Sequence, residues 1–221
     1  MTFDTTFMLK HVPDFIHAAL VTLGIAGAAI AASLLVAVLN SILYYFRVPV
    51  FTSIVRAYTE LARNTPLLIP LFFLYFALPS IGIRMSSYTT ALLAMTFLGG
   101  GYLTEVFRAG IEAVPTSQLE SGLALGLSRW QLFWNIVLPQ AVRIATPSLF
   151  ANFIFLLKET TVVSAVAVPE ILYTTTNYIA LYYKTYEMLL MMTALYLLLF
   201  LPLSFVLSWL ERRFQHGQFG T

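Results

Sequence analysis

The chain reads AALVTLGIAGAAIAASLLVAVL from Ala18 to Leu39, a stretch without a single charged residue. At about 1.5 Å of rise per residue, a helix of this length crosses the roughly 30 Å hydrocarbon core of a bilayer. The strands of a transmembrane barrel would instead alternate apolar and polar residues over segments of about ten residues. No such alternation occurs in this stretch, so it predicts a transmembrane helix.

The composition of the whole chain agrees with this prediction. Its 221 residues are 59% hydrophobic and only 10% charged, which leaves too little polar material for the surface of a water-soluble domain. The net charge of +2 comes from arginines and lysines spread along the chain, so a nucleic-acid-binding surface is not expected. With no cysteine, neither a disulfide framework nor a thiolate metal site can form.

Further apolar runs predict an all-α integral membrane protein with about five transmembrane helices and no internal repeat. The predicted spans are Phe15 to Phe46, a second assembled from the amphipathic segment Phe51 to Arg63 and the short run Leu67 to Pro79, Tyr88 to Phe107, Ile144 to Val168, and Glu187 to Leu210. Pro13 is expected to precede the first span. Three consecutive glycines, residues 99–101, cost helix propensity and predict a bend or a close backbone contact.

The distribution of positive charge predicts the orientation of the helices, because cytoplasmic loops of membrane proteins are enriched in Lys and Arg. An outside N-terminus and a cytoplasmic C-terminus place eight basic residues in the cytoplasm, namely Arg47, Arg56, Arg63, Arg108, Arg129, Arg143, Arg212 and Arg213. Only Lys10, Arg84 and Lys184 then face the outside, and Lys158 falls within the fourth span.

A long polar stretch, from about residue 112 to 139, separates the third and fourth spans. It predicts two short cytoplasmic helices, because Pro115 suits a first turn, Gly126 a left-handed C-terminal position and Ser128 an N-cap. Leu119 and Leu123 are four residues apart and are expected on one exposed face of the first helix. An apolar face outside the bilayer indicates a partner that covers it.

The spacing in this stretch resembles the cytoplasmic loop of the permease subunits of prokaryotic ABC importers. That loop carries Glu-Ala-Ala, then Gly, then Ile-x-Leu-Pro, and the residues at these offsets are Glu120, Gly126, Ile136, Leu138 and Pro139. Ser121 and Gly122 replace the two alanines, which keeps both positions small. The resemblance implies that about Thr116 to Leu127 forms the coupling helix that docks on an ATPase subunit.

Three other segments resemble the polar amino acid branch of that family: Ala62 to Leu68, in which Asn64 replaces a glycine, Tyr102 to Pro115, and Leu156 to Thr161. The resemblance implies a single permease domain over residues 1–221, with its core at about 15–213, in the bacterial cytoplasmic membrane. It also implies two ATPase subunits, a second permease subunit that is either a copy or a related chain, and an extracytoplasmic solute-binding protein. No nucleotide-binding motif is present, so ATP and Mg²⁺ are expected to be used by the ATPase, with no cofactor on this chain.

Polar residues within or beside the spans are candidates for a substrate path, since charges at membrane depth are costly without partners or water. They are Arg63, Asn64, Thr65, Glu105, Lys158, Glu159, Thr160, Thr161 and Ser164. Two alternatives stay open: Lys158 and Glu159 could form structural ion pairs with each other or with a neighbouring helix, and Glu105 could pair with Arg108 one turn away. The Tyr residues between Tyr173 and Tyr186 are expected to form an interfacial aromatic belt.

Other functions remain as alternatives. An ATPase-independent secondary transporter or a structural membrane subunit would share the apolar spans. An intramembrane enzyme would need paired catalytic groups, and the two aspartates, Asp4 and Asp14, both lie near the N-terminus. The sequence leaves open which amino acid is carried, whether the permease pair is a homodimer or a heterodimer, and whether the binding protein is free, anchored or fused.

Overall fold

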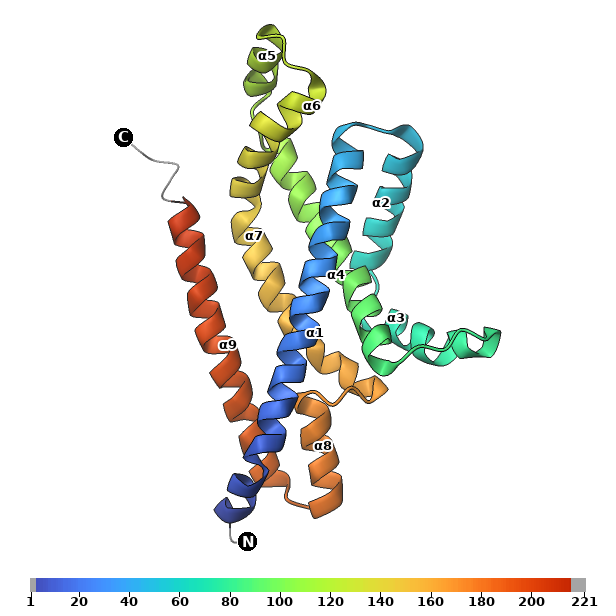
Figure 1. Ribbon diagram of the computed structural model, residues 1–221, viewed down its shortest axis with the longest axis vertical. Helices are drawn as coiled ribbons and strands as arrows, with labels where there is room; N and C mark the ends of the chain where they lie inside the picture. The colour runs from blue at the N-terminus through green and yellow to red at the C-terminus, as the bar shows by residue number, and fades with distance from the viewer. Residues whose placement is uncertain (1–2, 216–221) are drawn as a thin grey trace. The chain divides into compact units, whose positions relative to one another are not determined.

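A computed structural model describes residues 3–215, so both ends of the predicted 1–221 domain lie outside the described residues. Every regular element in the described part is helical (Figure 1), which confirms the all-α prediction. The first elements are α1 (Thr5–Tyr45), α2 (Pro49–Arg63), α3 (Leu68–Phe72), η1 (Phe73–Ala77), η2 (Leu78–Ile81) and α4 (Ser87–Glu112). They are followed by α5 (Thr116–Ala124), α6 (Arg129–Leu132), η3 (Phe133–Val137), α7 (Leu138–Glu159), η4 (Thr160–Val166), α8 (Ile171–Tyr182) and α9 (Thr185–Gln215).

Four helical stretches among the described residues are long and apolar enough to cross a membrane. They are Thr5–Tyr45, Ser87–Glu112, Arg129–Val166 and Thr185–Arg213. The broken pair Pro49–Arg63 and Leu68–Ile81 raises the number to five if it counts as one span. This agrees with the prediction of about five spans, whereas the orientation of the termini stays a prediction.

Two helices extend beyond the predicted spans. The first helix begins at Thr5 and contains Pro13, instead of starting after this proline. The helical stretch that carries the fourth span begins at Arg129 rather than near Ile144, because α6, η3 and α7 follow one another without a break. The second of the two predicted short cytoplasmic helices is therefore continuous with the fourth span.

The described chain divides into two compact units, each assembled from separate segments. Unit 1 comprises residues 3–31, 65–96 and 154–206, and unit 2 comprises residues 32–64, 97–153 and 207–215. Each unit has its own apolar core and its own polar cluster. The single domain expected from the sequence stays a prediction.

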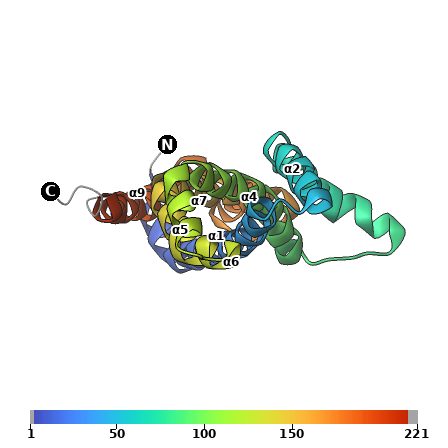
Figure 2. The same cartoon turned by 90° about the horizontal axis from the view of Figure 1, so that it is seen from above.

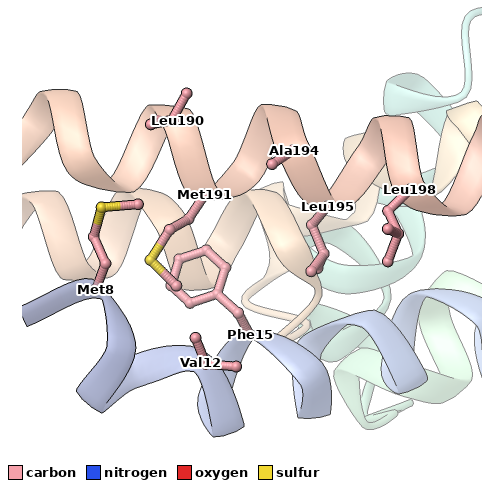
Figure 3. A pocket seen from close by; sticks show the side chains of 8 residues that line it. All are labelled: Met8, Val12, Phe15, Leu190, Met191, Ala194, Leu195 and Leu198. Atoms are coloured by element: carbon pink, nitrogen blue, oxygen red, sulfur yellow. The ribbon is translucent and has the colours of Figure 1, made fainter. Parts of the chain in front are cut away.

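The core of unit 1 forms where the N-terminal half of α1 meets α8 and α9. Phe15 packs against Met188 and Met191, and Ala18 packs near Ile171. Beside this core runs an apolar groove of about 410 Å³ (Figure 3), with α1 on one wall and α9 on the other. Its lining residues are Met8, Val12, Phe15, Leu190, Met191, Ala194, Leu195 and Leu198.

A fully buried carboxylate, Glu170, fixes the start of α8 in unit 1. Its two oxygens accept hydrogen bonds from the backbone N–H groups of Leu172 (2.9 Å) and Tyr173 (2.7 Å), and from the Tyr196 hydroxyl on α9 (3.1 Å). Burial raises the pKa of Glu170, although these hydrogen bonds oppose the shift. The group therefore acts as an N-cap that also joins α8 to α9.

Small residues on α4 allow close helix packing in unit 2. A side chain at Gly101 would collide with Ala62 of α2, and one at Gly100 would collide with the hydroxyl of Tyr58. That hydroxyl donates a hydrogen bond of 2.8 Å to the carbonyl of Phe97. The glycine run thus provides the close contact expected from the sequence, while α4 continues through it as a helix.

Candidate functional site

The loop that follows α4 folds into a defined helical turn at the end of unit 2. In Figure 1 and Figure 2, α5 and α6 lie side by side. Gly126 has a φ of 78°, a left-handed conformation that ends α5. Its N–H bonds to the carbonyl of Leu123 (2.9 Å), and the N–H of Leu127 bonds to that of Gly122 (3.1 Å). This pair of bonds is a Schellman motif, and it confirms the left-handed position expected for Gly126.

Ser128 starts the next helix as a capping box. Its hydroxyl accepts a hydrogen bond from the N–H of Gln131 (3.3 Å), while the Gln131 side chain accepts one from the N–H of Ser128 (2.9 Å). The predicted N-cap is therefore confirmed. Only two residues separate Ser128 from Leu125, the C-cap of α5, so the turn between the helices has little freedom.

Ile136, Leu138 and Pro139 lie where a π-helical turn is followed by the α-helix α7. Residues Phe133–Val137 form a π-helical turn, and α7 continues from Leu138. Pro139 has no N–H to offer to the preceding turn, and its ring would crowd a carbonyl four residues earlier. A π turn directly before the proline accommodates both effects without ending the helix.

Close packing at Gly122 accounts for the glycine that replaces the second of the two alanines. It is buried, and a Cβ atom there would collide with Leu132 and come within 3.0 Å of Ile136 Cδ1. Glycine thus allows α5 to pack closely against the start of the fourth span. Leu119 lies on the same face of α5 as Leu123, as predicted, but it packs against the core cluster of Val114, Phe133, Val137 and Ala141 and is half-buried rather than exposed.

The outward side of the loop combines polar and apolar groups. Glu120 and Ser121 are exposed, and so are three large apolar side chains: Leu123 is 54% exposed, Leu125 81% and Trp130 56%. Leu125 and Trp130 were missed in the sequence because they fall outside the apolar spacing of the first helix. Their exposure next to the left-handed turn gives the loop an apolar surface suited to a protein partner.

The candidate path residues fall into two groups. Arg63, Asn64 and Glu105 belong to unit 2, whereas Thr65, Lys158, Glu159, Thr160, Thr161 and Ser164 belong to unit 1. The structure brings Arg63 and Glu105 together, with 3.7 Å between Nη1 and Oε1. Arg108 Nε bonds to Glu105 Oε2 (2.9 Å), which confirms the pair expected one turn apart. Asn64 instead ends α2, and its amide donates to the carbonyl of Glu60 (2.8 Å).

The group in unit 1 centres on a tight 3₁₀ segment, Thr160–Val166, at the end of α7. Three hydroxyls bond to carbonyls in the preceding turn: Thr160 to Leu157 (2.7 Å), Thr161 to Lys158 (3.0 Å) and Ser164 to Thr161 (2.7 Å). Within residues 3–215, Lys158 and Glu159 form no ion pair with each other or with a neighbouring helix. Lys158 is exposed and Glu159 is half-buried.

Among the described residues, no group of three or more His, Cys, Asp or Glu side chains is arranged to hold a metal ion. In unit 1, His11 Nδ1 contacts Asp14 Oδ2 at 3.1 Å. Asp14 also accepts a hydrogen bond from the Tyr178 hydroxyl (2.7 Å). These contacts hold the start of α1 against α8.

Comparisons of the sequence with known proteins agree on one family of membrane transport proteins. Residues 29–216 match the family described as binding-protein-dependent transport system inner membrane component. The probable glutamine ABC transporter permease protein GlnP of Bacillus subtilis is 34% identical over 173 residues, which cover 78% of this chain and 79% of the relative. The glutamine transport system permease protein GlnP of Escherichia coli K12 is 30% identical over 215 residues, covering 96% and 98% of the two chains.

Solved structures show the same fold. A chain from the crystal structure of an amino acid ABC transporter with histidines superimposes with a TM-score of 0.89 at 28% identity, covering 96% of this chain and all of that one. A chain of the inward-facing MetNI methionine ABC transporter has a TM-score of 0.77 at 16% identity, with 93% and 98% covered. At that identity the second likeness concerns the fold alone.

Proposed function

Because this chain belongs to the family of binding-protein-dependent transport system inner membrane components, we propose that it is the membrane-spanning subunit of an ABC importer for polar amino acids. The spacing of Glu120, Gly126 and Pro139 predicted this family from the sequence, and the family match confirms it. As a multi-pass protein, the chain resides in the bacterial inner membrane. Amino acid permeases among its relatives, with similarity along most of the chain, support the substrate class.

The observation that carries the proposal is the geometry of the loop between α4 and α7. Its Schellman motif and capping box hold α5 in one position, and Glu120, Leu123 and Leu125 face outward. We infer that this surface, with Gly126 and the start of the fourth span around Ile136 behind it, docks on an ATPase subunit.

The packing of this loop suggests how force would pass through it. Leu119 of α5 lies against Val114, which follows α4, and against Phe133 and Val137 at the start of the fourth span. A displacement of α5 by a partner would therefore act on both helices at once. The docking surface also lies directly against the start of the fourth span, because Gly122 leaves no room for a Cβ between α5 and the side chains of Leu132 and Ile136.

The family implies an ATPase, a solute-binding protein and a second permease as partners. We propose two ATPase subunits, which bind ATP and Mg²⁺ and hydrolyse the nucleotide, and no cofactor on this chain. We further propose a second permease that is a copy or a related chain, and a binding protein that delivers the amino acid from outside. Five spans are too few to enclose a path for a solute alone, which supports the pairing.

The amino acid would need donors and acceptors along its path to replace lost water. Lys158 and Glu159 supply opposite charges, and Thr160, Thr161 and Ser164 supply hydroxyl oxygens that still have lone pairs free to accept. We propose these five residues, with Thr65, as the contribution of unit 1 to the path. Arg63, Asn64 and Glu105 are the contribution proposed for unit 2.

Co-purification tests the docking proposal. The double variant Glu120→Arg, Gly126→Trp is expected to insert in the membrane and to lose its candidate ATPase during extraction, while the native chain retains it. Ser80→Arg, an added charge on an exposed turn of unit 1, serves as the control and should retain the ATPase. Retention by the double variant would reject the docking surface and favour a secondary transporter or a structural subunit.

A further inference from the structure

Unit 2 contains a polar cavity of about 460 Å³ that shares Glu105 with the proposed substrate path but has binding groups of its own. It lies among α1, α2 and α4, and the residues that matter for its chemistry are Tyr44, Arg56, Thr59, Glu60, Glu105 and Arg108. Pockets that bind small molecules measure about 300 to 1,000 Å³, so the cavity is large enough for an amino acid. Of the candidate path residues, only Glu105 lines it.

Most of the charge on the α4 side of the cavity is already neutralised. Arg108 bonds to Glu105 through Nε (2.9 Å) and to Glu112 through Nη1 (2.6 Å). Glu105 also faces Arg63 at 3.7 Å, and Tyr44 donates a hydrogen bond to Glu112 (2.9 Å). The charges of these side chains are paired with one another, so they line the cavity without offering a free charge to a ligand.

On the α2 side, two opposite charges remain available. Arg56 and Glu60 are one helical turn apart, yet within residues 3–215 neither takes part in an ion pair. The Arg56 guanidinium lies over the Tyr44 ring, 5.7 Å from its centroid, which leaves its edge N–H groups free to donate. Glu60 Oε2 accepts one hydrogen bond, from Asn64 at 3.3 Å.

A third group lies on the same helix between them. Thr59 is only 6% exposed, and its hydroxyl has no hydrogen-bond partner within the described chain. A buried hydroxyl is normally paired. Its position in the cavity wall next to Arg56 and Glu60 gives the cavity a donor and acceptor that its own side chains leave unused.

We propose that this cavity binds a small zwitterion with a primary ammonium group, its anionic oxygens held by Arg56 and its ammonium by Glu60. An arginine fork suits carboxylate or phosphate oxygens, and the free carboxylate suits the ammonium. Two sources share this chemistry: a free amino acid and the ethanolamine headgroup of a phospholipid. Arg56 and Glu60 are not among the residues proposed for the substrate path, and the existence of this site does not depend on that function.

Equilibrium binding to the full-length permease in phosphatidylglycerol nanodiscs tests the site. Two soluble probes, L-glutamine and glycerophosphoethanolamine, represent the two sources. We expect at least one probe to bind, and Arg56→Gln and Glu60→Gln each to weaken its binding at least about tenfold. Arg143→Gln removes the same charge from an exposed position of unit 2 outside the cavity and should leave binding unchanged. The tighter probe identifies the source.

A modified probe tests whether the ammonium group of the ligand binds to Glu60 and its anionic oxygens to Arg56. N-acetyl-L-glutamine lacks the ammonium, so its binding to the native chain should be about tenfold weaker than that of L-glutamine, and Glu60→Gln should weaken it no further. Binding of neither parent probe, or equal binding by Arg56→Gln and the native chain, would overturn the site. Loss of binding in Glu159→Gln alone would also overturn it, while leaving the proposed substrate path intact.

Discussion

Two carboxylates of unit 2, Glu105 and Glu112, and one of unit 1, Glu170, are accommodated in different ways. In unit 2, Glu105 and Glu112 are paired with arginines at the ends of the helices. In unit 1, Glu170 is fully buried and is satisfied by two backbone N–H groups and the hydroxyl of Tyr196. An arginine thus pairs with the carboxylates that water still reaches, whereas the deeply buried carboxylate depends on fixed hydrogen-bond donors.

The two units also differ in the number of cations they hold. Unit 2 holds Arg47, Arg56, Arg63, Arg108, Arg129, Arg143, Arg212 and Arg213, whereas unit 1 holds Lys10, Arg84, Lys158 and Lys184. The excess in unit 2 is the asymmetry on which the predicted orientation rests, because the cytoplasmic side of a membrane protein is the one enriched in Lys and Arg.

The largest expected effect is therefore an all-or-none difference in accessibility. The chain has no cysteine, so single cysteines report position without background. Ala124→Cys, on α5 of unit 2, and Thr185→Cys, at the start of α9 in unit 1, are both exposed positions. In intact spheroplasts a membrane-impermeant maleimide should label only Thr185→Cys, and in inverted vesicles only Ala124→Cys. The reverse pattern would place the coupling loop outside and refute its docking on a cytoplasmic ATPase.

The next effect concerns the hydrogen-bonded carboxylate of unit 1. Glu170→Ala leaves two N–H groups of α8 and the Tyr196 hydroxyl unpaired in a buried place, at about 1 kcal/mol or more for each. We expect a loss of about 3 kcal/mol in the free energy of unfolding, measured by denaturation in detergent. Glu170→Gln retains an acceptor oxygen and should lose only about 1 kcal/mol. Small and equal losses of unfolding free energy in both variants would show that water replaces the carboxylate as acceptor for these N–H and O–H groups.

The pH dependence of the same pair of proteins provides a second check. Burial raises the pKa of Glu170 above its ordinary value of 4.5, so the folded state favours the protonated carboxyl. The stability that this protonation provides is fully present below the ordinary pKa and is lost as pH rises through the raised value. Relative to Glu170→Gln, which does not titrate, the native chain should thus become less stable from pH 4 towards neutrality. A constant difference would mean that the pKa is not raised.

Local patterns in the sequence predicted much of the fold and of the loop. Apolar runs gave the spans, and Gly126 and Ser128 gave the helix end and the cap because their bonds reach only a few residues along the chain. Burial of Glu170 could not be predicted in this way, since its partner Tyr196 is 26 residues away. The exposure of Leu119 was predicted wrongly for the same reason: its packing against the cluster of Phe133 and Val137 depends on how α5 folds back on the next helix.

The smallest expected effect is in the arginine network of unit 2. Arg108 and Glu105 are each roughly a third exposed, so water screens part of their attraction. In a double-mutant cycle of Arg108→Gln and Glu105→Gln, we expect a coupling energy of about 1 kcal/mol in the free energy of unfolding, and less at high salt. Glu112 and Arg63 remain beside the vacated positions and limit the loss. A coupling of about 3 kcal/mol that does not respond to salt would mean that the pair is as sheltered as Glu170, and the contrast between the two units would then disappear.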